Sequence, residues 1–463
     1  MQRLKPINLK LPARASIWYL GANATAKAVG FLITPFFTRM ISGQAYGELT
    51  LYLSMLGIAT VSCSALNTGS PIYDGIKRFE DKKGGYIKAS LLVSVTFSLI
   101  VCAVLFALRS FFELKPHLFI PLTLQILCDG IVAVYLTSAK YSYEYKRVTM
   151  IILLTSVVPP LATLGLLKIA NGRFRVRIYL LLAISVFLSI YSLYKILSMK
   201  GKVTGEMTRL HIKASMPLLP HTISSALSGQ ADKLIITAYL GANALAKYAV
   251  IHSLGIGLQF AISAVGFALG PWIIRRLEGG DYNEVAKITI ILISTFSALS
   301  LCVIALAPEA MRILAPKEYL DAFPALLPIA LSTPLSLLSS VISTCLIHFQ
   351  KRRETVALSV VGALFSLLLN FTLIKKFGYL GAGLTILLSQ FVSVLIGLAF
   401  LFKTKLGKEL EAGAIIKNFI PTATLGVMII FLFKFPALRV LTLIIPATIL
   451  LRNFYSLRGE IVE

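Results

Sequence analysis

Residues 88–110 read KASLLVSVTFSLIVCAVLFALRS, and no charged side chain stands between Lys88 and Arg109. The twenty residues between these two charges would form a helix about 30 Å long, which matches the hydrocarbon core of a bilayer. Apolar windows of similar length recur along the whole chain. The stretch therefore predicts one transmembrane helix among many.

The composition excludes a soluble protein. Hydrophobic residues make up 57% of the 463 residues and charged residues only 14%, whereas a soluble domain carries about 25% charged residues. The mean hydropathy is +0.82. We expect an all-α integral membrane protein with about fourteen transmembrane helices, the first near 16–42 and the last near 437–451.

A net charge of +25 raises the question of a nucleic-acid partner, which the placement of the charge argues against. The basic residues lie mostly in loops, and the loops on the N-terminal side of the membrane carry roughly twice as many as those on the other side. By the positive-inside rule, both termini face the cytoplasm. One outward loop disagrees, so either it binds anionic headgroups or substrate, or a helix nearby is miscounted. Its basic residues are Lys168, Arg173, Arg175 and Arg177.

The cysteines indicate no metal or cofactor. Five are present, all inside apolar runs, without a CxxC pair or histidines at metal spacing. We expect the cysteines to act as small residues that fill the helical core.

An internal repeat divides the chain. A shift of 199 residues places FTRMISGQAYGELTLYLS (37–54) over ITAYLGANALAKYAVIHS (236–253), and Thr38 then meets Thr237. Similar composition alone would align apolar helices, but here the order of helix, small-residue turn and helix recurs as well. Parallel repeats of this kind are a transporter design with a cavity between the halves. The predicted parts are an N-terminal cytoplasmic cap (1–15), a first six-helix bundle (16–198), a cytoplasmic linker (199–213), a second six-helix bundle (214–402) and a terminal helix pair with tail (403–463).

Lys27 is the first charge predicted to lie inside a span. A charge in hydrocarbon costs about 2.5–3.5 kcal/mol, so it usually faces a partner or a water-filled cavity. Asn23 lies four residues earlier on the same helix face, and Pro35 removes a backbone donor where the helix could bend. A lysine that reaches the membrane surface along its own chain is the alternative.

The seventh expected helix carries a polar stripe. His221, Ser225, Ser228 and Asp232 follow at steps of four, three and four, which places them on one face. Lys233 follows Asp232 directly, and adjacent residues point about 100° apart on a helix, so each is expected to have a further partner. A structural ion pair between helices and a role in lining a lumen remain equally open.

Two further polar groups allow two readings. Asp129 shares a face with Gln125, and His252 lies two turns from Gln259. Asp129 could couple transport to protons or sodium, and His252 could titrate near neutral pH. An interhelical hydrogen bond is the more common role of such groups.

Several stretches resemble the Wzx-type oligosaccharide-lipid flippases of the polysaccharide-exporter branch of the MOP superfamily. FFTRMISGQAYGELTLY (36–52) looks like the junction between the first two helices of this family, and QADKLIITAYLGANALAKYAVIHSL (230–254) looks like its counterpart in the second half. MRILAPKEYLDAFPALLPIAL (311–331) and LLNFTLIKKFGYLGAGLTILLSQF (368–391) resemble later junctions in the same order. Ala246 departs from the pattern, where a glycine is common.

The resemblance implies two six-helix bundles in a V, alternating access, and export of an undecaprenyl-diphosphate-linked oligosaccharide for surface polysaccharide such as O-antigen. The membrane would be the cytoplasmic membrane of a bacterium or archaeon, and the partners would be membrane lipids, a polysaccharide polymerase and chain-length proteins. No cofactor is implied beyond coupling to H+ or Na+. A diphosphate needs cationic partners, and by position we nominate Lys27, Arg39, Lys233, Lys247 and His252, with Asn23, Asp129, His221 and Asp232 as polar or coupling groups.

Two other functions compete with a flippase. A multidrug antiporter of the same superfamily would share the fold but usually relies on acidic groups in its cavity, and the first two spans hold no acid except Glu48 at a boundary. A membrane-embedded glycan polymerase or glycosyltransferase should show a large extracytoplasmic loop or an acidic metal-binding cluster. Neither is found in the sequence, so we expect a transporter and not an enzyme.

Overall fold

A computed structural model describes residues 10–67, 69–108, 116–167, 174–402 and 412–462, together with 404, 406 and 407. Helices make up all regular structure within these residues. The chain divides into two compact units, 1–230 and 231–463. The boundary falls inside α10 (Leu219–Leu240).

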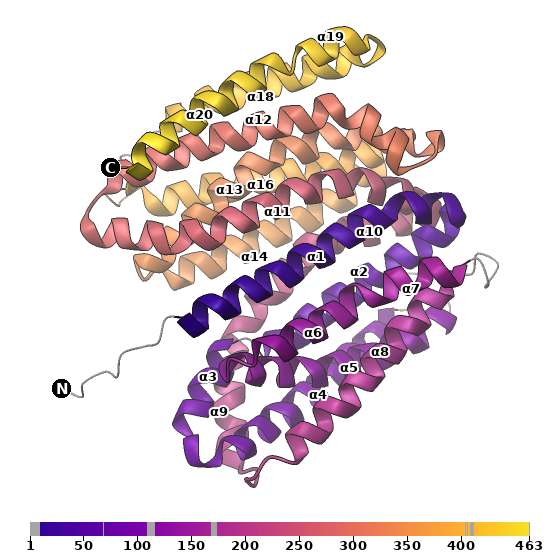
Figure 1. Ribbon diagram of the computed structural model, residues 1–463, viewed down its shortest axis with the longest axis vertical. Helices are drawn as coiled ribbons and strands as arrows, with labels where there is room; N and C mark the ends of the chain where they lie inside the picture. The colour runs from indigo at the N-terminus through magenta and orange to yellow at the C-terminus, as the bar shows by residue number, and fades with distance from the viewer. Residues whose placement is uncertain are drawn as a thin grey trace. The chain divides into compact units, whose positions relative to one another are not determined.

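Within the residues described, unit 1 contains nine complete α-helices and the first half of α10 (Figure 1). They are α1 (Lys10–Met40), α2 (Gly43–Ala65), α3 (Gly69–Arg78), α4 (Lys83–Leu108), α5 (Pro116–Tyr141), α6 (Tyr145–Ser156), α7 (Val158–Leu167), α8 (Arg175–Leu197), α9 (Gly205–Ser215) and the first half of α10, with short 3-10 turns at Glu80–Lys82 and Met216–Leu218.

Unit 2 continues from the second half of α10. Its helices are α11 (Ala242–Gly279), α12 (Tyr282–Leu314), α13 (Leu326–His348), α14 (Arg352–Leu369), α15 (Lys375–Phe377), α16 (Tyr379–Leu401), α18 (Ala412–Phe431), α19 (Pro436–Leu441) and α20 (Ile444–Val462). A 3-10 segment, η3 (Lys317–Ala325), precedes α13, a π-helical turn (Asn370–Ile374) joins α14 to α15, and a 3-10 turn (Leu432–Lys434) follows α18.

The predicted fold class is confirmed as an all-helical membrane protein. Helical residues make up most of each of the fourteen expected spans, and ten helices in the described part of the chain are long and apolar enough to cross a membrane. Two helices outside this set, α1 and α10, contain the charges Lys27, Asp232 and Lys233. Of the outward basic loop, Lys168 and Arg173 lie outside the described residues, as do residues 1–9 of the predicted N-terminal cap.

Prolines explain where the fifth expected span is divided. It consists of α6 and α7, and Pro159 and Pro160 lie in the first turn of α7. A proline lacks the amide that would continue the hydrogen bonds of the preceding helix, and it tolerates a first-turn position. The break at Val157 is therefore the point at which two helices replace one.

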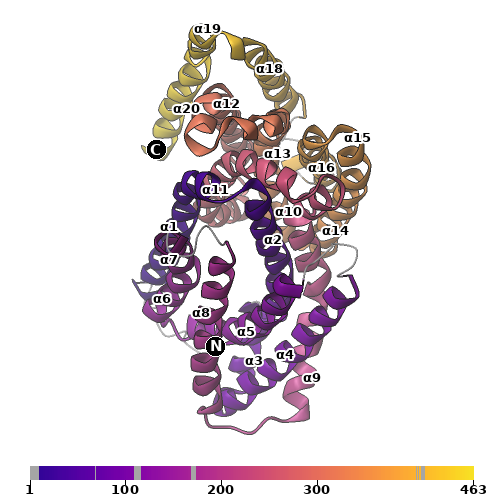
Figure 2. The same cartoon turned by 90° about the vertical axis from the view of Figure 1, so that its right-hand side faces the viewer.

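Two short helices occupy segments where the sequence predicts no helix of their own. The second span was expected to run to residue 71, but α2 ends at Ala65 and α3 begins at Gly69. The predicted linker 199–213 contains α9, whose N-cap Thr204 accepts a hydrogen bond from the amide of Met207. Figure 2 shows α9 beside α3 and α4, and contacts between them confirm this packing.

The two units bury separate hydrophobic cores. In unit 1 the core joins α3, α4, α5, α8 and α9 around the fully buried Tyr86. In unit 2 it joins α11, α12, α13, α14 and α16. The terminal helices α18 and α20 pack along α12 (Figure 1), and a buried Arg439 of α19 pairs there with Glu309 of α12.

Candidate functional site

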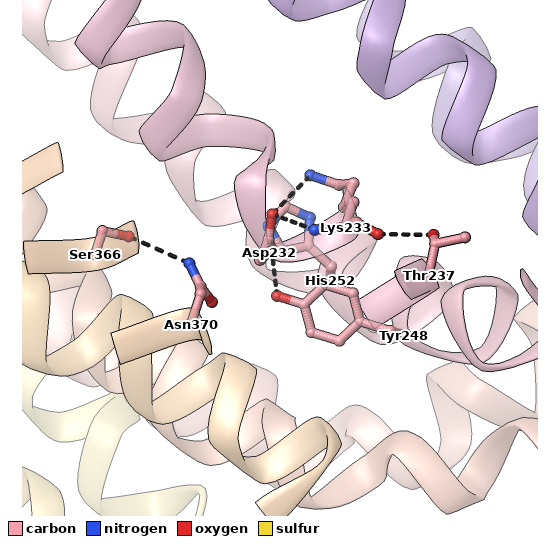
Figure 3. Close-up of polar contacts among 7 residues, drawn as sticks. All are labelled: Asp232, Lys233, Thr237, Tyr248, His252, Ser366 and Asn370. Atoms are coloured by element: carbon pink, nitrogen blue, oxygen red, sulfur yellow. Dashed lines mark hydrogen bonds and ion pairs between the residues drawn. The ribbon is translucent and has the colours of Figure 1, made fainter. Parts of the chain in front are cut away.

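A buried ion-pair cluster in unit 2 is centred on Asp232. The side chains of Asp232 and Lys233 are only 5% and 9% exposed, and Lys233 Nζ lies 3.7 Å from Asp232 Oδ1. The amide of Lys233 donates to the same Oδ1 at 2.9 Å. The lysine therefore folds back on its neighbour, and the carboxylate receives both its charge and its backbone amide (Figure 3).

The second oxygen of Asp232 is held from α11. Tyr248, which is fully buried, donates its hydroxyl to Asp232 Oδ2 at 2.5 Å, and His252 Nε2 lies 4.0 Å from the same oxygen. Tyr248 and His252 are one helical turn apart, so both rings reach one carboxylate. A buried charge is stable only when it is paired and hydrogen-bonded, and Asp232 meets both conditions.

Several polar atoms of unit 2 are buried without a hydrogen bond to any described residue, and two of them belong to residues drawn in Figure 3. These two are Nδ1 of His252 and Oδ1 of Asn370. Asn370 lies at the start of the π-helical turn and donates from Nδ2 to Ser366 Oγ at 3.5 Å (Figure 3). Such turns occur frequently at functional sites because the extra residue redirects a side chain.

A second polar network lies inside unit 1 and includes Asp129. Ser185 donates to Asp129 Oδ1 at 2.9 Å, Gln125 Nε2 contacts Ser185 Oγ at 3.4 Å, and Tyr52 donates to Gln125 Oε1 at 2.7 Å. The chain of bonds connects α2, α5 and α8. Asp129 is therefore satisfied between helices, which is the more common of its two predicted roles.

The cationic candidates differ in their surroundings. Lys27 is exposed near the middle of α1. Arg39 is also exposed, and its Nη1 donates to the carbonyl of Pro35 at 3.0 Å. Lys247 forms a 2.5 Å ion pair with Asp321 of η3. Lys233 alone of these four belongs to the buried cluster.

The remaining predicted residues lie apart from this cluster. Asn23 lines a cavity in unit 1, with its Nδ2 bonded to the carbonyl of Tyr19 at 2.8 Å. His221 lies eleven residues before Asp232, about 16 Å along α10. Ser225 and Ser228 of the predicted stripe are exposed, whereas Asp232 is buried. The stripe therefore does not form one continuous polar contact.

Several residues of these contacts were not singled out as site residues from the sequence, among them Tyr52 of α2. Tyr248 and Asn370 belong to unit 2, and Ser185 to unit 1. The only local signal for Ser185 is its recurrence with Ser189 and Ser192 on one face of α8, and all three are buried. Asn370 carries no signal, because a π-helical turn has no distinctive sequence pattern.

Comparisons with known proteins resolve the fold. No protein-family model matches the chain, and no curated protein matches it by sequence. Among solved structures, the chain is similar to the lipid II flippase MurJ in an inward closed conformation, with a TM-score of 0.70 and 13% identity over 97% of this chain and 100% of that one.

Multidrug transporters are similar as well. An inward-facing multidrug resistance MATE family transporter of the MOP superfamily gives a TM-score of 0.65 at 13% identity, over 84% of this chain and 96% of that one. A MATE transporter in complex with MaD3S gives 0.54 at 13% identity, over 88% and 97%. The chain therefore has the fold of MOP-superfamily transporters.

Proposed function

We propose that this protein is a flippase that moves an anionic lipid-linked oligosaccharide, carried on undecaprenyl diphosphate, across the cytoplasmic membrane by alternating access. The observation that carries the proposal is the exposure of Lys27 near the middle of α1, a 31-residue helix that the sequence predicts to span the membrane. A lysine at that depth is costly in lipid, so its exposure favours a water-filled path. An ammonium on such a path attracts an anionic headgroup.

The similarity to a lipid II flippase supports the same class of substrate. Lys233 would provide a second cation. Its ammonium is paired with the Asp232 carboxylate, and an approaching diphosphate would compete with that carboxylate for it. Arg39 is a further cation on α1, twelve residues after Lys27. The proposed partners are membrane lipids, a polysaccharide polymerase and chain-length proteins, with H+ or Na+ coupling.

Reversal of charge at Lys27 tests the proposal. In proteoliposomes that contain a fluorescent undecaprenyl-diphosphate-linked oligosaccharide, Lys27→Glu should lower the flipping rate by more than about tenfold, because the headgroup would meet a negative charge. Lys27→Arg keeps the charge and is expected to retain most of the rate. Lys200→Glu reverses an exposed lysine just after the end of α8 and serves as the matched control.

Folding must be separated from transport. Lys27→Glu should match the wild type in detergent-solubilised yield and melting temperature, because Lys27 is exposed. Wild-type flipping in the charge-reversed protein would reject the role of Lys27.

A multidrug antiporter is the second candidate. Asp129 is an acid within the helices of unit 1, held by Ser185, and several similar structures are MATE transporters. This function predicts efflux of a cationic dye that Asp129→Asn abolishes, with flipping of the glycan lipid absent. The flippase predicts the reverse pattern for the two substrates.

A further inference from the structure

A cavity of about 750 Å³ lies within unit 1, at the end where α1 begins. Its polar lining consists mainly of four tyrosines, one amide and one ammonium: Tyr19, Tyr73, Tyr141, Tyr143, Asn23 and Lys140. These residues come from α1, α3, the end of α5 and the turn that follows it. The volume is in the range of small-molecule sites, about 300–1,000 Å³.

All four tyrosines line the cavity, and two of them, Tyr141 and Tyr143, are also 39% and 46% exposed. Tyr73 and Tyr141 lie 5.4 Å apart between ring centroids and are tilted by 44°. Tyr143 has a left-handed backbone (φ 54°), which is strained for any residue except glycine and persists only where the surroundings enforce it. The turn is enforced by hydrogen bonds from the amides of Tyr143 and Glu144 to the carbonyls of Lys140 and Ala139.

One hydroxyl of the lining lacks a hydrogen-bond partner within the part of the chain that the structure describes. Oη of Tyr19 is buried and forms no hydrogen bond to any described residue. Buried hydroxyls are nearly always bonded, so a hydroxyl or a phosphate oxygen of a ligand would complete this one. Asn23, one turn further along α1, adds an amide that can both donate and accept.

The charge of the cavity selects against cations. Tyrosine cages can bind quaternary ammonium groups, but Lys140 lines this cavity and none of its described lining residues is acidic. Lys140 has no acidic partner among the described residues. A ligand that combines flat apolar faces, hydroxyl groups and a negative charge fits this lining.

We propose that this tyrosine cavity binds a glycosyl phosphate, with the sugar ring against Tyr73, Tyr141 and Tyr143 and the phosphate at Lys140. The inference rests on the proposed function and adds a loading site to it. Asn23 and Lys27 are four residues apart on α1, so Lys27 lies about 6 Å further along the same face. The positive-inside rule predicts that this end of α1 faces the cytoplasm, where the lipid-linked sugar would be presented.

A tryptophan beside the cavity allows the binding to be measured. The chain has two tryptophans, and Trp18 directly precedes Tyr19 of the lining on α1. A Trp272→Phe protein in phosphatidylcholine nanodiscs with a tryptophan-free scaffold protein therefore reports on Trp18 alone. N-acetylglucosamine 1-phosphate should change its fluorescence with saturation, and it should bind more tightly than either N-acetylglucosamine or inorganic phosphate.

Variants of the lining locate the site. In the same background, Tyr73→Ala should raise the Kd of the sugar phosphate by more than about tenfold, since it removes a stacking surface. Tyr73→Phe keeps the ring and should retain most of the affinity, which excludes collapse of the cavity as the cause. Lys140→Gln should weaken binding of the sugar phosphate but not binding of the neutral sugar. Tyr194→Ala removes a ring that is 67% exposed on α8 and is the control.

Several results would overturn the inference. Inorganic phosphate that binds as tightly as the sugar phosphate would show an anion site without sugar recognition. Loss of sugar-phosphate binding when phosphatidylglycerol replaces phosphatidylcholine in the nanodiscs would identify a lipid headgroup site. An unchanged Kd in Tyr73→Ala would place the binding elsewhere.

Transport assays distinguish this inference from the proposed function. If the wild type flips the glycan lipid and Tyr73→Ala leaves its apparent KM unchanged, the loading site is rejected and the flippase stands. If the wild type binds the sugar phosphate in the cavity but flips no glycan lipid, the flippase is rejected and the binding site stands.

Discussion

At the scale of single residues, a buried carboxylate in unit 2 is stabilised by the hydrogen-bond donors and the ammonium that surround it. Asp232 accepts from Tyr248 and from the amide of Lys233, and it pairs with the ammonium of Lys233. The sequence singles out Asp232 and Lys233 as candidate site residues because two adjacent charges interrupt an apolar helix. It does not predict Tyr248 as a partner, because a tyrosine sixteen residues away on another helix is an ordinary apolar residue by pattern.

The hydroxyl of Tyr248 can be tested directly. Tyr248→Phe removes a hydrogen bond to a buried charged group, which contributes about 1.5–3 kcal/mol. We expect a lower melting temperature in detergent, measured by intrinsic fluorescence, because Asp232 loses one of its donors. His252 and Lys233 remain, so the protein should still fold.

Removal of a hydroxyl from a tyrosine that is not buried serves as the control. Tyr239→Phe on α10 changes a side chain that is 44% exposed, and its melting temperature should stay close to that of the wild type. Equal melting temperatures for Tyr248→Phe and Tyr239→Phe would contradict a stabilising role of the Tyr248 hydroxyl.

Among the elements, the short helices α3 and α9 are the ones that the sequence does not predict. Both are too short and too polar to give the apolar window from which spans are read, and their identity as helices depends on packing against α4. The packing buries His211 of α9 completely, with its Nδ1 3.1 Å from Oη of Tyr86 and 3.3 Å from Oγ of Ser90. Tertiary contacts therefore decide this region, and local propensity does not.

The burial of His211 predicts a pH-dependent stability. Burial lowers the pKa of His211 from 6.5 to about 4. Between these values the unfolded chain binds a proton that the folded chain does not, so the free energy of unfolding falls as the pH drops. The loss is up to about 1.4 kcal/mol per pH unit and is absent above pH 6.5.

A comparison of variants isolates this histidine. Melting temperatures at pH values from 7.5 to 4.5 should fall less steeply for His211→Gln than for the wild type, whatever the stability of the variant at neutral pH. His348→Gln, at the partly exposed end of α13, should keep the wild-type slope. Parallel curves for His211→Gln and the wild type would disprove the assignment.

For the whole molecule, the pattern of apolar windows predicts nearly all membrane helices because length and hydropathy are imposed by the bilayer itself. Helix ends and breaks are set by single residues, such as the prolines of α7, and so they shift by several positions. The polar networks depend on contacts between helices far apart in sequence, and only their charged members are visible in advance. The sequence therefore predicts the architecture well and the site in part.

The orientation of the chain is the prediction that concerns all helices together. The excess of lysine and arginine on one side predicts that both termini lie in the cytoplasm. The segment between α8 and α9 should then be cytoplasmic, and the turn between α10 and α11 should be external. Lys202 and Asn243 are exposed in these two places, and each can be replaced by cysteine. The native cysteines lie within helices, buried or half-buried, so the unsubstituted protein should give a low background.

A membrane-impermeant maleimide then reads the topology. In intact spheroplasts, Asn243→Cys should be labelled and Lys202→Cys protected, and in inverted vesicles the pattern should reverse. In the predicted fourteen-helix topology, an odd number of membrane crossings separates the two positions. Labelling of both from one side would therefore show a miscounted helix near α9 or α10. Reversal of both signals would place the tyrosine cavity at the outer surface, where it could receive the glycan after transport but could not load it.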